Sequence, residues 1–214
     1  MIKAVVFDMD GVIVDDIKCD FSCWKRALCR SGVNLSLGEY KRFSGMTAKQ
    51  IFRKYIEDIS DDDTIVLEGE KDKYFVECLK KGGVTMTRGL ISFLNLLLDN
   101  SIAISLATAA SKKKANSILE HFSIDSYFQV IVTGDDVSTG KPDPQIFLKA
   151  SAILGMSPQE CVVVEDAPNG VRAAKKGGMK CIAITTTHKA EELAEADKII
   201  NTFAELTFLT LSQL

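Results

Sequence analysis

Short apolar segments rich in β-branched residues recur along the chain and alternate with segments of helical character. The apolar segments are Ala4–Phe7, Ile102–Leu106, Val130–Val132, Val162–Val164, Cys181–Ile184 and Lys198–Ile200. Runs of this kind are typical of strands buried on both faces of a parallel sheet. The alternation therefore predicts a doubly wound α/β core with a mainly parallel, Rossmann-like sheet.

Helix signals lie between these segments. Pro144 fits the first turn of a helix, and Gly155 fits its end. Apolar residues follow Pro144 at helical spacing: Ile146, Phe147, Ala150, Ile153 and Leu154. Pro168 and Gly177-Gly178 bracket a second predicted helix in the same way.

The alternation stops between about Asp15 and Gly83. Three segments there have helical character instead: Phe21–Arg30, Ala48–Ile56 and Ile65–Lys80. Ser60 precedes three aspartates, and a hydroxyl followed by an acidic first turn is a good helix start. We therefore expect a second, helical unit inserted after the first strand.

Composition narrows the range of functions. With 214 residues, 46% hydrophobic and 26% charged, the chain is typical of a globular protein with one main domain and a smaller insertion. Its formal net charge of -3 argues against nucleic-acid binding. No segment approaches the ~20 apolar residues of a membrane span. The apolar run Met1–Phe7 is too short for a signal peptide, so we expect no membrane partner.

The cysteines show no CxxC spacing. They are Cys19, Cys23, Cys29, Cys78, Cys161 and Cys181. Reduced thiols in the cytoplasm are the simpler expectation. Cys19 and Cys23 lie four residues apart on a predicted helix, but two soft ligands alone do not close a zinc site.

Two aspartates directly follow the first predicted strand. Asp8 and Asp10 lie two residues apart, and Gly11 follows where the chain must turn. The carboxyl ends of parallel strands are where ligands bind. Two carboxylates there are costly, because they repel each other and burial penalises their ionisation. A divalent cation relieves that cost and shields an incoming phosphate. Capping of a turn is the structural alternative, but it does not require two acids.

Polar groups suited to phosphate follow two further predicted strands. The segment Ala107–Ser111 offers a hydroxyl and a run of backbone N–H groups ahead of a helix, which can hold phosphate oxygens. Serine and threonine also cap helices without binding anything. Lys141 lies between Gly140 and Pro142, where a stiff loop presents its ammonium as a point charge. A solvated loop lysine is the alternative for Lys141.

A second acidic pair follows Val162–Val164. Glu165 and Asp166 come directly after this strand. Together with Asp8 and the backbone carbonyl of Asp10, they make a set of oxygen ligands suited to Mg²⁺. The cofactor expected from this set is Mg²⁺.

In this order, the four segments resemble the four motifs of the haloacid dehalogenase superfamily. Within it, the chain resembles the β-phosphoglucomutase-like phosphatases, which carry a helical cap between the first and second motifs. The resemblance covers almost the whole chain and implies a catalytic core of residues 1–14 and 84–214, with a cap of residues 15–83. It implies these roles: Asp8 as nucleophile, Asp10 as general acid and base, Thr108, Ala109 and Lys141 as phosphate contacts, and Asp166 with Glu165 at the metal.

The residue types decide between the reactions of this superfamily. Asp10 favours phosphate chemistry, because halide leaves without a proton and the dehalogenases lack this second aspartate. Mutases of the family carry a histidine where this chain has Asp20, and an arginine near Lys49 is also absent. We therefore prefer a phosphatase acting on a small phosphorylated metabolite, with sugar phosphates among the candidates. A β-phosphoglucomutase-type enzyme and a non-catalytic phosphometabolite-binding protein stay open as alternatives.

The predicted cap holds further candidate site residues. Gly45, Thr47 and Lys49 are candidate substrate contacts, with a simple turn at Gly45 as the alternative. The segment Lys112–Lys114 is either a solvated surface run or a group of charges that attracts an anion. Asp16 and Asp20 add negative charge near the entrance, which argues against ordinary handling of sugar phosphates. The sequence leaves the oligomeric state open, and we favour a monomer.

Overall fold

The computed structural model describes residues 1–214 and contains a six-stranded parallel sheet. Its strand order is β5-β4-β1-β6-β7-β8. The strands are β1 (Ala4–Phe7), β4 (Ala103–Ala107), β5 (Val130–Val132), β6 (Cys161–Glu165), β7 (Lys180–Ile184) and β8 (Lys198–Ile200). In the register, Phe7 at the end of β1 lies between Leu106 of β4 and Val164 of β6. The predicted doubly wound α/β fold is confirmed.

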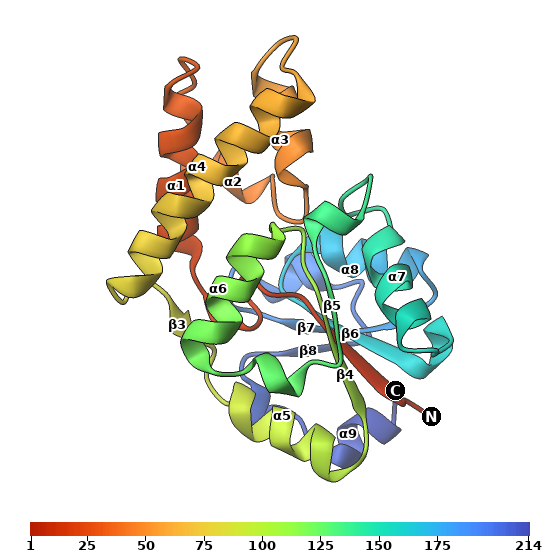
Figure 1. Ribbon diagram of the computed structural model, residues 1–214. Coiled ribbons are helices and arrows are strands. Elements are labelled where there is room, and N and C mark those ends of the chain that lie inside the picture. The colour runs from red at the N-terminus through yellow and green to blue at the C-terminus, as the bar shows by residue number, and fades with distance from the viewer.

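Helices cover both faces of this sheet (Figure 1). One face packs against α5 (Leu90–Asp99) and α6 (Lys112–Phe122), and the other against α7 (Gln145–Ile153) and α8 (Pro168–Lys176). Side chains of β1 alternate between the two, since Val5 and Phe7 belong to the first core and Ala4 and Val6 to the second. The predicted helix starts at Pro144 and Pro168 are confirmed.

Shorter elements complete this part of the chain. The helix α9 (Phe208–Ser212) lies near the C-terminus. Five 3₁₀ turns occupy Asp125–Tyr127, Gly134–Asp136, Pro158–Glu160, Ala190–Leu193 and Phe203–Glu205. None of the helices combines the length and hydrophobicity needed to cross a membrane.

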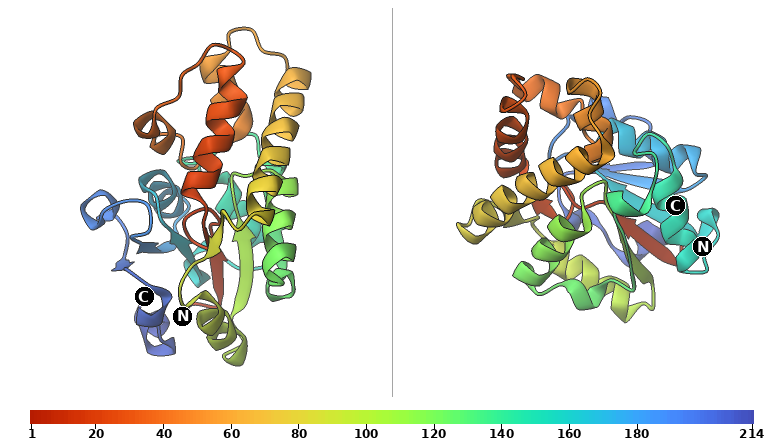
Figure 2. Two further views of the ribbon diagram at one scale, coloured as in Figure 1. Left: turned by 90° about the vertical axis from the view of Figure 1, so that its left-hand side faces the viewer. Right: turned by 45° about the horizontal axis from the view of Figure 1, so that its top comes forward.

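Four helices follow the first strand and form a group of their own, the helical insert. They are α1 (Ile17–Cys29), α2 (Leu37–Lys41), α3 (Ala48–Tyr55) and α4 (Asp61–Lys80). An antiparallel ribbon of β2 (Val14–Asp15) and β3 (Thr85–Met86) joins the insert to the sheet. The insert has its own hydrophobic cluster, centred on Trp24 and Phe52. Both views in Figure 2 show it as a separate group, and the left view places the chain termini at the opposite end.

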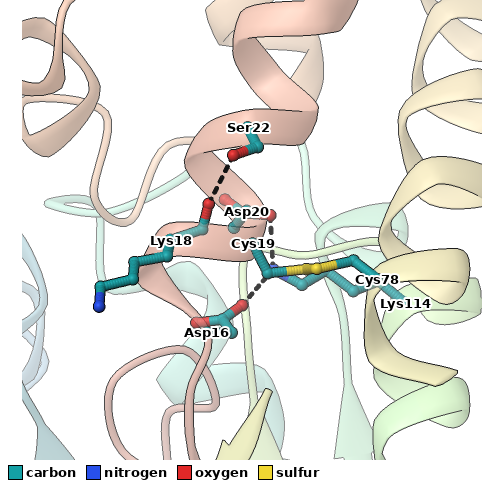
Figure 3. Close-up of a disulfide and its surroundings, with 7 residues drawn as sticks. All are labelled: Asp16, Lys18, Cys19, Asp20, Ser22, Cys78 and Lys114. Atoms are coloured by element: carbon teal, nitrogen blue, oxygen red, sulfur yellow. Dashed lines mark hydrogen bonds and ion pairs between the residues drawn. A yellow bond between two sulfur atoms is a disulfide. The ribbon is translucent and has the colours of Figure 1, made fainter. Parts of the chain in front are cut away.

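A disulfide joins two helices of the insert. Cys19 of α1 and Cys78 of α4 are bonded, with their Cα atoms 6.2 Å apart (Figure 3). The expectation of reduced thiols throughout is therefore wrong for this pair. The two residues are separated by 59 positions, and the packing of α1 against α4 brings them together. The other four thiols are free.

Candidate active site

The carboxyl ends of three adjacent strands bring the predicted site residues together. Because β4 and β6 flank β1, Thr108 and Glu165 lie on either side of Asp8. The backbone continues the strand pairing there: the Asp8 N–H donates to the carbonyl of Val164 at 3.0 Å, and the Thr108 N–H to that of Val132 at 3.0 Å. The positions of these side chains are therefore fixed by the sheet itself.

A tight turn after Asp8 permits the close approach of the second acidic pair. Gly11 has φ of +76°, and a Cβ at this position would overlap the carboxylate of Asp166. The N–H of Gly11 donates to the carbonyl of Val14 at 2.7 Å, which closes the turn. Only glycine meets both demands without strain.

Lys141 reaches the centre of the site from the loop before α7. Its side chain is 1% exposed, and its Nζ lies 2.7 Å from Asp8 Oδ1 and 2.6 Å from Glu165 Oε1. The ammonium also lies 4.7 Å from the centre of the Phe147 ring. Burial alone would lower the pKa of Lys141, but Asp8 and Glu165 outweigh burial and raise this pKa above its ordinary value. Lys141 is therefore a buried, charged ammonium.

Three carboxylates form a buried acidic cluster. Oxygens of Asp8, Glu165 and Asp166 lie within 4.8 Å of one another. Burial raises the pKa of Asp8 to about 7, with Glu165 and Asp10 adding to the effect and Lys141 opposing it. Burial and then Glu165 raise the pKa of Asp166 well above its usual range. Asp166 Oδ1 is buried without a hydrogen-bond partner.

These features fit a hard divalent cation. Carboxylate oxygens are the donors that Mg²⁺ prefers, and a cation would relieve both the mutual repulsion and the missing partner of Asp166. Two backbone N–H groups, of Asp166 and Ala167, donate to Glu165 Oε2 at 2.8 and 2.9 Å and orient that carboxylate. The side chain of Asp10 lies outside the cluster, so only its backbone carbonyl is left for the predicted ligand role.

The Asp10 side chain pairs with Lys114 of α6. The Lys114 Nζ lies 3.0 Å from Asp10 Oδ1, 2.9 Å from Asp16 Oδ2 and 2.7 Å from Asp20 Oδ1, and its side chain is 1% exposed. The interpretation of Lys112–Lys114 as a solvated surface run is therefore wrong for Lys114. Lys114 lies on the inner face of α6 with Ile118, four residues further on. The spacing of four residues between Lys114 and the apolar Ile118 was the signal in the sequence that Lys114 faces inward.

A cavity between the sheet edge and the helical insert contains most of these groups. From the sheet side it is lined by Asp8, Asp10, Gly11, Thr108, Ala109, Ala110, Lys114, Asp166, Thr187 and His188. From the insert it is lined chiefly by Asp16, Asp20, Trp24, Tyr40, Lys41, Gly45, Glu68 and Lys71. Burial raises the pKa of Glu68 to about 7 and that of Asp16 well above its usual range. The cavity is thus rich in carboxyl groups at both ends.

Among the lining residues that were not predicted from the sequence, two lie beside the acidic cluster. Thr187 and His188 follow β7, and the Thr187 hydroxyl donates a hydrogen bond to Asp166 Oδ2. His188 Nδ1 lies 3.1 Å from the backbone oxygen of Asp166. The signal was present, because polar residues follow the predicted strand Cys181–Ile184 just as they follow the other strands.

The three substrate contacts predicted in the insert differ in their position relative to the cavity. Gly45 lines the cavity, and its carbonyl accepts the Lys141 N–H at 2.8 Å. Thr47 is the N-cap of α3, whereas Lys49 is exposed and pairs with Asp61 at 2.9 Å. Neither Thr47 nor Lys49 is among the residues that line the cavity. The structure therefore brings only Gly45 of the three to the cavity.

Fold and site together define a class of protein. A parallel α/β sheet with clustered carboxylates at the ends of its central strands is suited to hold a cation and an anionic substrate at one edge. The family model described as haloacid dehalogenase-like hydrolase matches residues 5–184. The chain belongs to this family.

Individual relatives agree with this assignment. The chain is 31% identical to validoxylamine A 7'-phosphate phosphatase of Streptomyces hygroscopicus subsp. limoneus over 96% of both chains. It is 30% identical to hexitol phosphatase A of Escherichia coli (strain K12), covering 96% of this chain and 93% of the relative. A solved β-phosphoglucomutase from Clostridium difficile superposes with a TM-score of 0.88 at 25% identity, covering 100% of this chain and 96% of that one.

Proposed function

We propose that this protein is a Mg²⁺-dependent phosphatase that hydrolyses a small phosphorylated metabolite, such as a sugar phosphate, through an aspartyl-phosphate on Asp8. The observation that carries the proposal is the position of Asp8, which is buried at the cavity, belongs to the acidic cluster and has its Oδ1 2.7 Å from the Lys141 Nζ. The two relatives named as phosphatases, of validoxylamine A 7'-phosphate and of hexitols, support a phosphoric monoester hydrolase.

Each side chain has a role that follows from its chemistry. A carboxylate oxygen of Asp8 attacks phosphorus and displaces the alcohol. Asp10, whose side chain is 35% exposed, gives a proton to the leaving oxygen and later takes one from the attacking water. Lys141 offsets negative charge on the transferring oxygens. Asp8, Glu165 and Asp166 would hold Mg²⁺, which when bound also offsets this charge and keeps the carboxylates ionised.

Thr108 and Ala109 complete the phosphate contacts in this proposal. The Ala110 N–H donates to Thr108 Oγ1 at 3.1 Å, so the Thr108 hydroxyl proton is free to point to a ligand. The Ala109 backbone belongs to the same turn ahead of α6, where N–H groups favour an anion. Both residues line the cavity next to Asp8.

The division into a core of residues 1–14 and 84–214 and a cap of residues 15–83 is part of the proposal. Its support is the separate hydrophobic cluster of the insert and the β2–β3 ribbon through which the chain enters and leaves it. Hydrogen bonds hold the cap over the cavity: the Gly140 N–H donates to Gln50 Oε1 at 3.1 Å, and Asn169 Nδ2 to the Ser44 carbonyl at 2.9 Å. A closed cap limits the access of water to the reaction.

Structural similarity to a β-phosphoglucomutase favours one alternative, a phosphosugar mutase. Against it, the mutase histidine is replaced by Asp20, whose carboxylate pairs with Lys114 at 2.7 Å. The two activities are separated by following β-glucose 1-phosphate with a trace of the bisphosphate. We expect phosphate release without isomerisation, whereas isomerisation that outruns phosphate release would establish the mutase.

The hydrolysis of a generic aryl phosphate tests the proposal, with Mg²⁺ and with EDTA. We expect activity only with Mg²⁺, and a loss of more than about 10³-fold in Asp8→Asn. Asp99→Asn, which makes the same change on an exposed helix end, is the matched control and retains activity. Full activity in Asp8→Asn would contradict the assignment of Asp8. A wild-type protein that binds phosphate but hydrolyses no ester would instead be a binding protein.

A further inference from the structure

We propose that the cavity selects phosphate esters whose alcohol part is an uncharged or amine-bearing polyol and excludes a second anionic group. This inference rests on the proposed phosphatase function and concerns the part of the cavity around Lys114 and Lys71, here called the leaving-group end. The leaving-group end is lined by Asp10, Asp16, Asp20, Glu68, Lys71 and Lys114.

Carboxyl groups from the insert dominate this end. Asp16 and Asp20, in the first turns at the start of α1, converge on Lys114 (Figure 3). The Tyr40 hydroxyl donates to Asp20 Oδ2 at 2.9 Å and fixes that carboxylate from the other side. Glu68 adds a third carboxyl group from α4. In either protonation state, none of these groups offers positive charge to a second phosphate or to a carboxylate.

The buried lysines of this end already have acidic partners. Three carboxylates surround the Lys114 ammonium within 3.0 Å. The Lys71 Nζ lies 3.0 Å from Asp72 Oδ1 and 4.9 Å from the centre of the Trp24 ring. A second anion on the substrate would have to displace one of these carboxylates, and like charges at such distances repel strongly.

The remaining lysine of the cavity belongs to the opposite end. Lys41 is exposed, and its ammonium donates to the carbonyl of Thr187 at 3.3 Å. The Thr187 hydroxyl in turn donates to Asp166, a member of the acidic cluster. Lys41 is therefore placed near the end that would hold the reacting phosphate, and it does not supply a cation to the leaving-group end.

Hydroxyl and ammonium groups of a substrate are donors that match the carboxyl acceptors of the leaving-group end. Asp16 is 2% exposed and lines the cavity, and its Oδ2 lies 2.9 Å from the Lys114 Nζ. A carboxylate oxygen has a second lone pair, so a substrate hydroxyl or amine can donate to this carboxyl group beside Lys114. Trp24 and Tyr40 add apolar ring surface for the carbon skeleton of a polyol.

A matched pair of substrates tests the inference on the wild-type protein. Sorbitol 6-phosphate and 6-phosphogluconate have the same carbon chain and differ in a hydroxymethyl group against a carboxylate. We expect kcat/KM to be at least about tenfold higher for sorbitol 6-phosphate. Glucosamine 6-phosphate should be hydrolysed at least as well as glucose 6-phosphate. Equal rates for the first pair, or a preference for 6-phosphogluconate, would overturn the inference.

Variants locate the source of the selectivity. Asp20→Asn and Glu68→Gln each remove one carboxylate and should reduce the ratio between sorbitol 6-phosphate and 6-phosphogluconate, whereas Asp62→Asn on the exposed start of α4 should leave it unchanged. An unchanged ratio in both cavity variants would refute the assignment of selectivity to these groups.

Hydrolysis of an aryl phosphate, measured in parallel, separates a failure of this inference from a failure of the proposed phosphatase function. Hydrolysis of the aryl ester without hydrolysis of either polyol ester would overturn this inference and leave the phosphatase function standing. No hydrolysis of any ester would overturn the function itself.

Discussion

Replacing Lys141 by methionine should destabilise the protein sharply as well as abolish activity. Methionine keeps much of the length and apolar surface of the lysine side chain but removes its charge. The Lys141 ammonium is 1% exposed and touches two carboxylates, of Asp8 and Glu165. In Lys141→Met both carboxylates stay buried without a cation, so the free energy of the folded state rises, whereas that of the unfolded state, with its solvated carboxylates, changes little.

The size of the effect follows from the distances. At 2.7 and 2.6 Å, and with an effective dielectric constant of about 20, each contact is worth about 6 kcal/mol of Coulomb attraction. The cost of burying the ammonium offsets much of this, and removal of one partner of a buried pair costs about 3–5 kcal/mol. We expect the free energy of unfolding to fall by that amount, from a total that is about 5–15 kcal/mol in most proteins.

Urea unfolding in EDTA measures this loss, with Lys149→Met as the matched control. Lys149 lies 3.7 Å from Asp136 on the surface, with both side chains 41% exposed, and such pairs contribute about 0–1 kcal/mol. The double variant Lys141→Met/Glu165→Gln should recover part of the loss, because it removes one stranded charge. Equal losses in Lys141→Met and Lys149→Met would refute the reasoning.

Three further predictions follow from the glycines and the acidic cluster. Gly45→Ala should lower kcat/KM for an aryl phosphate by about tenfold or more, because φ is +85° and the new Cβ would lie 2.7 Å from Lys141 Cβ. Gly69→Ala, in open space within α4, should instead raise the free energy of unfolding by about 1 kcal/mol and keep activity; similar behaviour of the two variants would contradict the geometry. The pKa of Asp8 rises from 3.8 to about 7 on folding, so in EDTA stability should fall as pH increases through that range. Mg²⁺ should therefore raise Tm more at pH 8 than at pH 5, and an equal increase at both would count against Asp8 as a ligand.

Much of the fold is predictable from the sequence because its strands are buried on both faces. Such strands are continuous apolar runs, and polar residues then stand out where each run ends. Asp8, Thr108 and Asp166 were singled out in this way. The strand order was not predictable, since the placement of β1 between β4 and β6 depends on pairing between distant segments.

The features that could not be predicted from the sequence depend on packing between distant segments of the chain. The pairing of Lys114 with Asp20 joins residues 94 positions apart, and the disulfide of Cys19 joins residues 59 positions apart. Neither leaves a local pattern in the sequence. Lys49 was a candidate substrate contact, but in the structure it pairs at the surface with Asp61, at the start of α4.

The aspartyl-phosphate on Asp8 is the central claim, and trapping it tests that claim most directly. The protein is mixed with Mg²⁺ and an aryl phosphate, quenched in acid during turnover, digested and analysed by mass spectrometry. We predict a phosphoryl group on the peptide that contains Asp8, and none in the Asp8→Asn variant. Steady hydrolysis by the wild-type protein with no phosphoryl group on that peptide at any quench time would contradict the account.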